Sequence, residues 1–161
     1  MTALFPGSFD PVTLGHMDII KRSSAMFDRL IVAVMNNMHK KTAFGIEERV
    51  GFLSLSVKGI KNVEVREYSG LLTDFFISSK ADVIIRGLRS PAEFDHEMQY
   101  AQAFKKVNDK IETLFLPALP EHMFVSSSMA KEAALFGGDL QMLVPGGIIK
   151  DIQQKFNAGG L

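Results

Sequence analysis

The chain has 161 residues, of which 18 are basic and 18 are acidic, so its formal net charge is zero and its pI is about 6.9. A chain of this length forms one domain with a sizeable core, and zero net charge excludes a global field that would attract nucleic acid or a membrane surface. The absence of cysteine excludes disulfides and thiolate metal sites. No apolar run approaches the roughly 20 residues of a membrane span. Together these two observations favour a cytoplasmic protein.

Strand and helix patterns alternate along the chain. Buried strands are predicted at residues 2–5, 30–35, 63–66, 82–85 and 112–116, with helices at 16–27, 46–57, 71–79, 90–107, 126–136 and about 145–156. The helix at 90–107 has the clearest start, because Ser90 is a good N-cap and Pro91 and Glu93 suit the first turn. This order predicts an α/β fold with a doubly wound, five-stranded parallel sheet. We expect one domain over residues 1–161, with a C-terminal helical segment at about 139–157.

The segment from Phe5 to His16 connects the first strand to the first helix through small and turn-forming residues. Pro6-Gly7 and Asp10-Pro11 are each expected to turn the chain. The helix that follows carries free N–H groups and a partial positive charge at its start, which favours a phosphate-binding loop with His16 projecting toward the phosphate. The alternative is an ordinary strand–loop–helix junction with a surface histidine, and spacing alone leaves both interpretations open.

Further candidate residues follow the other predicted strands. The carboxyl ends of parallel strands meet at one edge of a sheet, and ligands bind there near the point where the strand order reverses. At these ends lie Lys40, Leu72, Arg86, Arg89 and Ser126 to Ser128. The arginines offer rigid forks for two phosphates, and the serines at a helix start offer a second anion cradle, which together fit a polyphosphate such as ATP. The alternatives are surface ion pairs, a solvated basic loop and a simple serine N-cap.

Several chemistries find no support in the sequence. No Gly-x-Gly-x-x-Gly follows the first strand, which counts against a dinucleotide-binding dehydrogenase. Ser-His-Asp arrangements, cysteine pairs and closely spaced acidic metal boxes are also missing. We therefore expect neither a covalent enzyme intermediate nor a metal held by protein side chains. An attacking phosphate is already ionised near neutral pH, so the protein would only have to align the reactants and stabilise charge.

Five short motifs are spread over nearly the whole chain. They are Pro6-Gly7-Ser8-Phe9-Asp10-Pro11, Thr13-x-Gly15-His16, Glu47-Glu48-Arg49, Ile85-Arg86-Gly87-Leu88-Arg89 and Val125-Ser126-Ser127-Ser128. Together they resemble the bacterial phosphopantetheine adenylyltransferase family of the nucleotidyltransferase superfamily. The resemblance implies a Rossmann-like nucleotidyltransferase fold and transfer of the adenylyl group of ATP to 4′-phosphopantetheine, giving dephospho-coenzyme A and pyrophosphate in the penultimate step of coenzyme A synthesis. It also implies Mg²⁺ carried with ATP, a homohexamer and feedback inhibition by coenzyme A.

The same resemblance implies roles for individual residues. Catalysis falls to His16, which stabilises the transition state, and to Lys40 and Arg89. The implied phosphopantetheine-binding residues are Ser8, Lys40, Leu72 and Arg86. The implied ATP-binding residues are Ser8, Phe9, His16, Gly87, Leu88, Arg89, Glu97, His122, Met123, Phe124, Val125, Ser126, Ser127 and Ser128. The departures from the family pattern are Ser8 for a common threonine, His96 for a frequent tyrosine, and His122-Met123 for an aromatic residue and a serine.

Two other functions stay open at this point. A sister adenylyl- or cytidylyltransferase acting on nicotinate mononucleotide or a phosphorylated alcohol would share the first loop and His16. Thr13, which stands where histidine is commoner, and the two-arginine corner argue against it. A noncatalytic nucleotide sensor could use the same phosphate loops, but it has less use for a histidine aimed at the reacting phosphorus.

Overall fold

The computed structural model of the protein describes residues 1–36 and 41–158. The strands are β1 (Thr2–Gly7), β2 (Arg29–Met35), β3 (Val63–Tyr68), β4 (Val83–Leu88) and β5 (Thr113–Pro117). The α-helices are α1 (Leu14–Met26), α2 (Ile46–Ser56), α3 (Leu72–Ser78), α4 (Pro91–Val107), α5 (Ser127–Leu135) and α6 (Ile149–Ala158). Two short 3₁₀ helices are η1 (Pro120–His122) and η2 (Gly146–Ile148). Each strand and helix predicted from the sequence is present, with ends shifted by a few residues.

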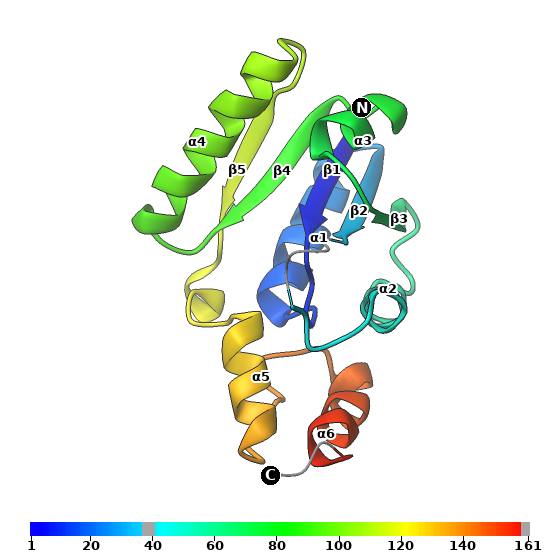
Figure 1. The fold of residues 1–161 in the computed structure, drawn as a ribbon, viewed down its shortest axis with the longest axis vertical. Coiled ribbons are helices and arrows are strands. Elements are labelled where there is room, and N and C mark those ends of the chain that lie inside the picture. The colour runs from blue at the N-terminus through cyan, green and yellow to red at the C-terminus, as the bar shows by residue number, and fades with distance from the viewer. Residues whose placement is uncertain (37–40, 159–161) are drawn as a thin grey trace.

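The strands form one parallel sheet in the order β3-β2-β1-β4-β5 (Figure 1). From β1 the chain first builds outward through β2 and β3. It then returns to the other side of β1 and builds outward through β4 and β5. The strand order therefore reverses between β1 and β4, and the predicted doubly wound parallel sheet is confirmed.

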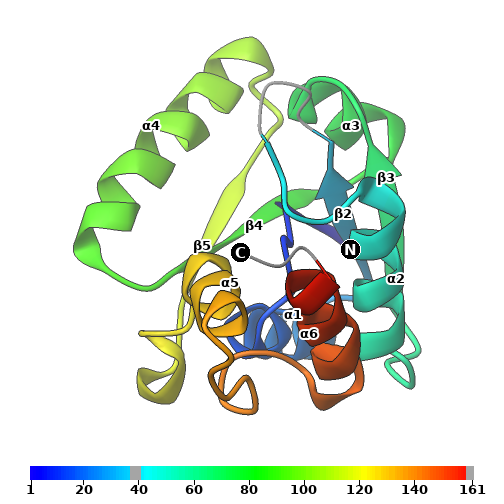
Figure 2. The ribbon, with the colours of Figure 1, turned by 60° about the horizontal axis from the view of Figure 1, so that its bottom comes forward.

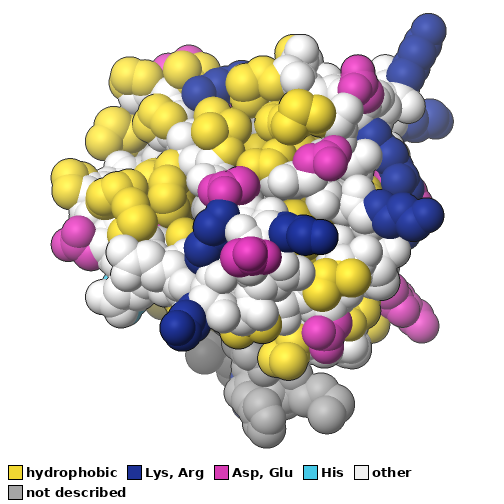
Figure 3. Space-filling view, turned by 90° about the horizontal axis from the view of Figure 1, so that it is seen from above, with side chains coloured by type: hydrophobic (Ala, Val, Ile, Leu, Met, Phe, Trp, Pro, Cys, Tyr) yellow, Lys and Arg dark blue, Asp and Glu magenta, His cyan; other side chains and the backbone are white. Residues whose placement is uncertain are grey.

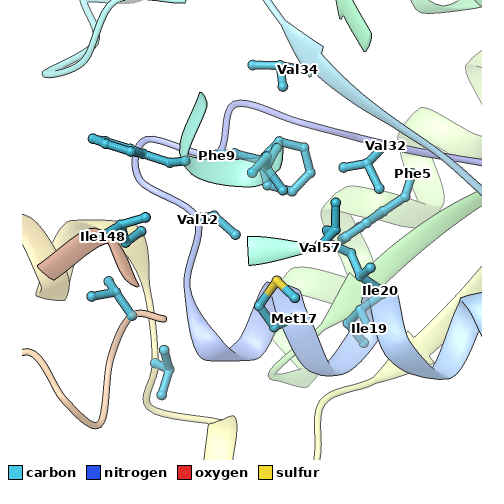
Figure 4. Packing of buried hydrophobic residues seen from close by; sticks show 14 of the residues in the cluster. Phe5, Phe9, Val12, Met17, Ile19, Ile20, Val32, Val34, Val57 and Ile148 are labelled. Carbon is cyan, nitrogen blue, oxygen red and sulfur yellow. The ribbon is translucent and has the colours of Figure 1, made fainter. Parts of the chain in front are cut away.

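Hydrophobic clusters cover both faces of the sheet. Because successive strand residues point to opposite faces, Leu4 and Phe5 of β1 belong to different clusters. Phe5 packs with side chains of α1 and α2 such as Ile20 and Leu53, and Figure 4 shows the part of this cluster around Phe5 and Ile20. Leu4 packs on the other face with Phe75 of α3. Burial on both faces explains why the central strands are apolar runs rather than alternating patterns.

The C-terminal part of the chain lies beyond the carboxyl end of β1, where α5 and α6 pack side by side (Figures 1 and 2). Val144, Ile148 and Ile152 are fully buried there in the Phe5 cluster. The carbonyl of Leu143 also accepts a hydrogen bond from the N–H of Leu14, over 2.9 Å. This segment therefore fixes the start of α1.

The first predicted turn is wrong, because β1 continues through Pro6 to Gly7 and pairs there with β2. The pairing of β1 with β4 covers only Ala3 and Leu4. The backbone of Pro6 faces β4, since its carbonyl accepts from the Arg86 side chain, so its missing N–H falls where no ladder bond is needed. The chain turns at Asp10-Pro11 instead, as expected.

Helix α4 covers the outer half of the sheet without burying any of its 17 residues. Its side chains Phe94, Tyr100 and Val107 are 39%, 56% and 71% exposed. Figure 3 views the molecule from the end opposite α5 and α6 and shows hydrophobic side chains gathered on the side that α4 occupies in Figure 1. Exposed apolar faces of this kind mark interaction surfaces.

Across residues 1–36 and 41–158, no helix combines the length and the apolar character needed to cross a membrane.

Candidate active site

A cavity of about 630 Å³ opens beside the carboxyl ends of β1 and β4, where the strand order reverses. We call it the central cavity. The residues predicted from the sequence that line it are Ser8, Phe9, His16, Arg86, Gly87, Leu88, Arg89, Glu97, Val125, Ser126, Ser127 and Ser128. The loop after β1, the end of β4 and the start of α5 therefore converge as the parallel-sheet argument predicted.

Four of the predicted residues that the structure describes do not line this cavity. Leu72 begins α3 and is partly buried against the Leu4 cluster. Met123 and Phe124 are 52% and 51% exposed beside η1. His122 is close to the cavity, because a Cβ placed on cavity-lining Gly15 would lie 3.8 Å from the Cβ of His122. Lys40 lies outside the described residues.

The cavity exists because β1 and β4 separate after their first residues. Their ladder ends at Leu4 and Ile84. Past that point the side chain of Arg86 bridges the two strands, with Nη1 donating to the carbonyl of Pro6 over 3.2 Å. The sequence predicted that Arg86 follows the fourth strand, but in the structure it lies within β4. A rigid strand therefore sets its backbone position.

His16 is oriented by the cap of the helix that carries it. Its Nδ1 accepts from the backbone N–H of Thr13 over 3.1 Å, and the Thr13 hydroxyl accepts from the backbone N–H of His16 over 3.3 Å. Because Nδ1 is an acceptor, the proton of the neutral ring resides on Nε2. The ring of Phe9 packs edge-on against the imidazole, with ring centroids 5.0 Å apart. The ring of His16 is therefore fixed in both position and tautomer.

The surroundings of His16 also fix its charge. Burial of the ring, and secondly the positive charge of Arg89, lower the pKa of His16 to about 4. The imidazole is therefore neutral near pH 7 and offers Nε2–H as a hydrogen-bond donor.

The N-terminus of α1 offers fewer free donors than the sequence indicated. The N–H of Leu14 binds the carbonyl of Leu143, and the N–H of His16 binds the Thr13 hydroxyl. Two of the first three N–H groups of the helix are thus already engaged. Anion binding at this end depends more on the His16 side chain than on the helix terminus.

Both predicted phosphate-binding arginines form ion pairs with carboxylates of α4. Arg86 is bidentate to Glu97, with Nε–Oε2 and Nη2–Oε1 distances of 2.5 and 2.6 Å. Arg89 pairs with Glu93, which also accepts from the backbone N–H of Arg89 over 2.8 Å. Ion pairs were the alternative interpretation of these arginines, but here the pairs line the cavity rather than the outer surface. An incoming phosphate must share the guanidinium groups with the glutamates or displace them.

The three serines at the start of α5 have different partners. The Ser126 hydroxyl caps the helix by accepting from the N–H of Met129 over 3.1 Å. The Ser127 hydroxyl donates to the carbonyl of Pro11 over 2.8 Å and so ties α5 to the loop after β1. Ser128 is exposed and lines the cavity. The serines thus combine a cap, a link between loops and a candidate ligand.

Sequence reasoning missed several charged residues of this site. Asp10 is 4% exposed and pairs with Lys131 of α5 over 2.9 Å. Burial raises the pKa of Asp10, but hydrogen bonds from Lys131 and from the N–H groups of Phe44 and Ala43 outweigh it, and the pKa lies below its usual value. The one available signal was that Lys131 follows Ser127 by four residues, on the same face of α5.

The charged groups that line the cavity balance one another. Its described acidic residues are Asp10, Glu93 and Glu97, and its described basic residues are Arg86, Arg89 and Lys131. The formal charges of these six side chains sum to zero, and the neutral His16 adds none. Nowhere in residues 1–36 and 41–158 do three or more histidines and carboxylates gather as a metal site.

These features define a class of protein. The sheet opens at its switch point, and a neutral, oriented imidazole, two arginines and a serine-rich helix start face one cavity. Such a site can hold a nucleotide polyphosphate and stabilise charge on a reacting phosphorus. The fold and the site together are those of a nucleotidyltransferase.

Comparisons with known proteins agree. The family model described as cytidylyltransferase-like matches residues 4–133. The phosphopantetheine adenylyltransferase of Clostridium tetani is 49% identical, over 96% of this chain and 97% of its own length. That of Finegoldia magna is 47% identical, over 96% and 95%. The chain therefore belongs to the phosphopantetheine adenylyltransferase family.

One solved structure shows the same fold at lower sequence similarity. It is a putative nicotinate-nucleotide adenylyltransferase from Vibrio parahaemolyticus, with a TM-score of 0.68, 20% identity and coverage of 99% of this chain and 93% of that one. At this identity the likeness concerns the fold alone.

Proposed function

We propose that this chain transfers the adenylyl group of ATP to the phosphate of 4′-phosphopantetheine, giving dephospho-coenzyme A and pyrophosphate. Its family membership supports this, because relatives of that name are 47% and 49% identical over nearly the full length. The observation that carries the proposal is the convergence of His16, Arg86 and Arg89 with the α5 serines on one cavity. Such a cavity can hold a nucleotide and a second phosphate side by side.

The reaction proposed is a direct in-line displacement. An oxygen of the acceptor phosphate attacks the α-phosphorus of ATP, the bond from that phosphorus to the bridging oxygen breaks, and pyrophosphate leaves with the electron pair. No general base is needed because the acceptor phosphate is already ionised. His16 donates its Nε2–H to an oxygen of the α-phosphate, where negative charge is redistributed in the transition state.

Two arginines divide the phosphates between them in this proposal. Arg86, in the opening between β1 and β4, takes the acceptor phosphate together with Ser8. Arg89 donates to the carbonyl of Val125 over 3.1 Å and so lies beside the start of α5, which supports its assignment to the ATP phosphates. The proposed acceptor contacts of Leu72 and Lys40 rest on the family resemblance, as do the remaining ATP contacts.

Magnesium is proposed to arrive with ATP. The described lining offers three carboxylates, but each is already paired with a cation, which does not suit a dedicated protein cage. The bound ion would neutralise part of the polyphosphate charge that a cavity of zero net charge leaves uncompensated. The residues Arg86, Arg89 and Lys131 then need only orient the phosphates.

A homohexamer and inhibition by coenzyme A complete the proposal. The exposed hydrophobic side chains of α4, among them Tyr100 and Val107, support burial of this face against other copies. Coenzyme A carries the same pantetheine arm and adenylyl group as the product, so it would compete at the central cavity. Light scattering of the purified chain tests the hexamer, and a monomer at micromolar concentration would contradict it.

The stereochemistry of transfer tests the in-line step. One diastereomer of the α-thio analogue of ATP would be turned over with 4′-phosphopantetheine, and the configuration at phosphorus in the product determined by ³¹P NMR. A single direct displacement inverts this configuration. Retention would require a covalent intermediate and would contradict the proposal, as would the absence of any dephospho-coenzyme A analogue in the mass spectrum.

A further inference from the structure

Two buried charged residues, one lining the central cavity and the other outside its lining, have no part in the reaction described above. Arg49 of α2 is 1% exposed and Asp10 of the loop after β1 is 4% exposed. A buried charge is unfavourable unless it is paired and hydrogen-bonded, so the contacts of these groups need an explanation.

Arg49 joins three backbone segments, one of which, at Ser8, is 41 residues away in sequence. Its Nε donates to the carbonyl of Phe44 over 3.1 Å. Its Nη1 donates to the carbonyls of Ser8 and Met35, over 2.8 and 3.2 Å. One planar guanidinium therefore fixes the loop after β1 relative to the end of β2 and the start of α2.

Asp10 holds the same region from the opposite side. Its Oδ1 accepts from the N–H of Phe44 over 2.9 Å, and its Oδ2 accepts from the N–H of Ala43 over 3.1 Å. Oδ2 also binds Nζ of Lys131 over 2.9 Å, which reaches α5. The backbone of Phe44 is thus held at its N–H by Asp10 and at its carbonyl by Arg49.

The side chain of Phe44 makes this point of attachment rigid. Phe44 is 1% exposed, and its ring packs edge-on against Phe52 of α2 and Phe156 of α6, with centroids 5.2 and 6.0 Å apart. Movement of either charged partner relative to Phe44 would break buried hydrogen bonds as well as this packing.

We propose that Asp10 and Arg49 are positioning residues, which grip the backbone of Phe44 from both sides and so hold the Ser8 loop in register with α5. Neither touches the reacting atoms. Arg49 acts through the carbonyl of Ser8, and Asp10 acts through Lys131 and through its own place in the loop. The inference rests on the proposed adenylyl transfer, whose two substrates meet between these elements.

The expected effect is on turnover more than on binding. A misplacement of about 1 Å far from the chemistry can cost on the order of 100-fold in rate, since transfer needs aligned reactants. ATP could still bind to Arg89 and Ser128, because neither residue contacts Asp10, Arg49 or Phe44 directly. A residue with only a structural role would lower stability but leave each folded molecule fully active.

The test compares Arg49→Lys with Arg29→Lys. Lysine keeps the buried charge but cannot span three carbonyls with one rigid fork. Arg29 pairs with Glu64 on the outer surface and serves as the matched control. For Arg49→Lys we expect kcat per folded molecule to fall by about tenfold or more, with the Kd of ATP changed by less than about threefold. Arg29→Lys should match the unchanged enzyme.

Asp10→Asn keeps an acceptor for a backbone N–H but loses the charge that holds Lys131. It should also lower kcat, and the double variant should lose less than the product of the two single losses, because both residues act on Phe44. These variants need only be measured on their folded fraction, determined by circular dichroism, so partial unfolding does not hide the result.

Two outcomes would overturn the inference. One is normal kcat per folded molecule in both single variants despite a lower Tm. The other is strictly multiplicative losses in the double variant. Failure of the proposed reaction itself is distinguishable, because the unchanged enzyme would then make no dephospho-coenzyme A.

Discussion

Nδ1 of His16 accepts a hydrogen bond from the backbone N–H of Thr13, over 3.1 Å, so the cap of α1 also sets the tautomer of the histidine. A capping box normally uses glutamate or glutamine at this third helical position. Histidine performs the same capping and leaves Nε2–H free to donate. One local motif therefore begins the helix and prepares the group that we assign to the transition state.

His16→Ala should retain the fold and much of the ATP affinity but lose turnover by about 100-fold or more, as removal of one transition-state donor typically does. His16→Gln is the matched control, because glutamine can still accept the Thr13 N–H and keep the helix cap. We expect Gln to restore Tm without restoring kcat. Steady-state kinetics and thermal unfolding of both variants measure this, and near-normal turnover in folded His16→Ala would exclude the assigned role.

Stability should depend on pH through His16. Burial and the charge of Arg89 lower its pKa to about 4 in the folded protein, whereas a histidine in an unfolded chain titrates near 6.5. The unfolded chain therefore binds more protons between these values. The contribution of the neutral ring to the free energy of unfolding is fully present above about pH 6.5 and is lost as the pH falls toward 4.

Denaturant unfolding of the unchanged protein and His16→Gln tests this dependence, because glutamine does not titrate. The free energy of unfolding of the unchanged protein, relative to the variant, should decrease from about pH 7 to about pH 5. Parallel stability curves over this interval would show that His16 keeps an ordinary pKa.

Arg86→Ala should chiefly weaken binding of 4′-phosphopantetheine. The substitution removes the proposed phosphate ligand and leaves the Glu97 carboxylate unpaired in the cavity, where it repels an anion. We expect KM for the acceptor to rise by about tenfold or more, with KM for ATP within about threefold. Arg66→Ala, which breaks an ion pair with Glu64 on the edge strand β3, is the control. Weakened ATP binding with unchanged acceptor affinity would reverse the assignment.

Substitutions of Ser126 and Ser128 at the start of α5 should have different effects, one on stability and the other on ATP binding. Ser126→Ala removes the helix cap and should cost about 1 kcal/mol of stability, which lowers Tm by roughly 2–4 °C in a chain of this size. Ser128→Ala should leave Tm unchanged and raise KM for ATP. Thermal unfolding and kinetics on the two variants compare these effects directly. If both variants lost the same stability and kept an unchanged KM for ATP, Ser128 would have a structural role like Ser126 and Ser127, and its assignment as an ATP ligand would be wrong.

The sequence predicted the sheet and the helices because local and global signals agree in them. The start of α4 follows from Ser90 and Pro91, and the central strands follow from their apolar runs. The end of β1 was misjudged because proline normally stops a strand. Only the separation of β1 from β4, a property of the assembled sheet, makes Pro6 acceptable there.

The site was predictable where its residues follow strands, and hidden where it depends on contacts between distant segments. The arginines and serines were found by their place after strands or at helix starts. Asp10 and Lys131 are 121 residues apart, and no periodicity relates them. Arg49 looks like a solvent-facing residue in Glu47-Glu48-Arg49, yet it is buried because three carbonyl groups accept its hydrogen bonds.

Pyrophosphate release from ATP and Mg²⁺, measured with 4′-phosphopantetheine, with nicotinate mononucleotide or with no acceptor, tests the central claim most directly. We predict release only with 4′-phosphopantetheine, together with dephospho-coenzyme A in the product mass spectrum. Pyrophosphate release with nicotinate mononucleotide would indicate an adenylyltransferase for that acceptor. No release with any acceptor, despite measurable ATP binding, would contradict adenylyl transfer altogether.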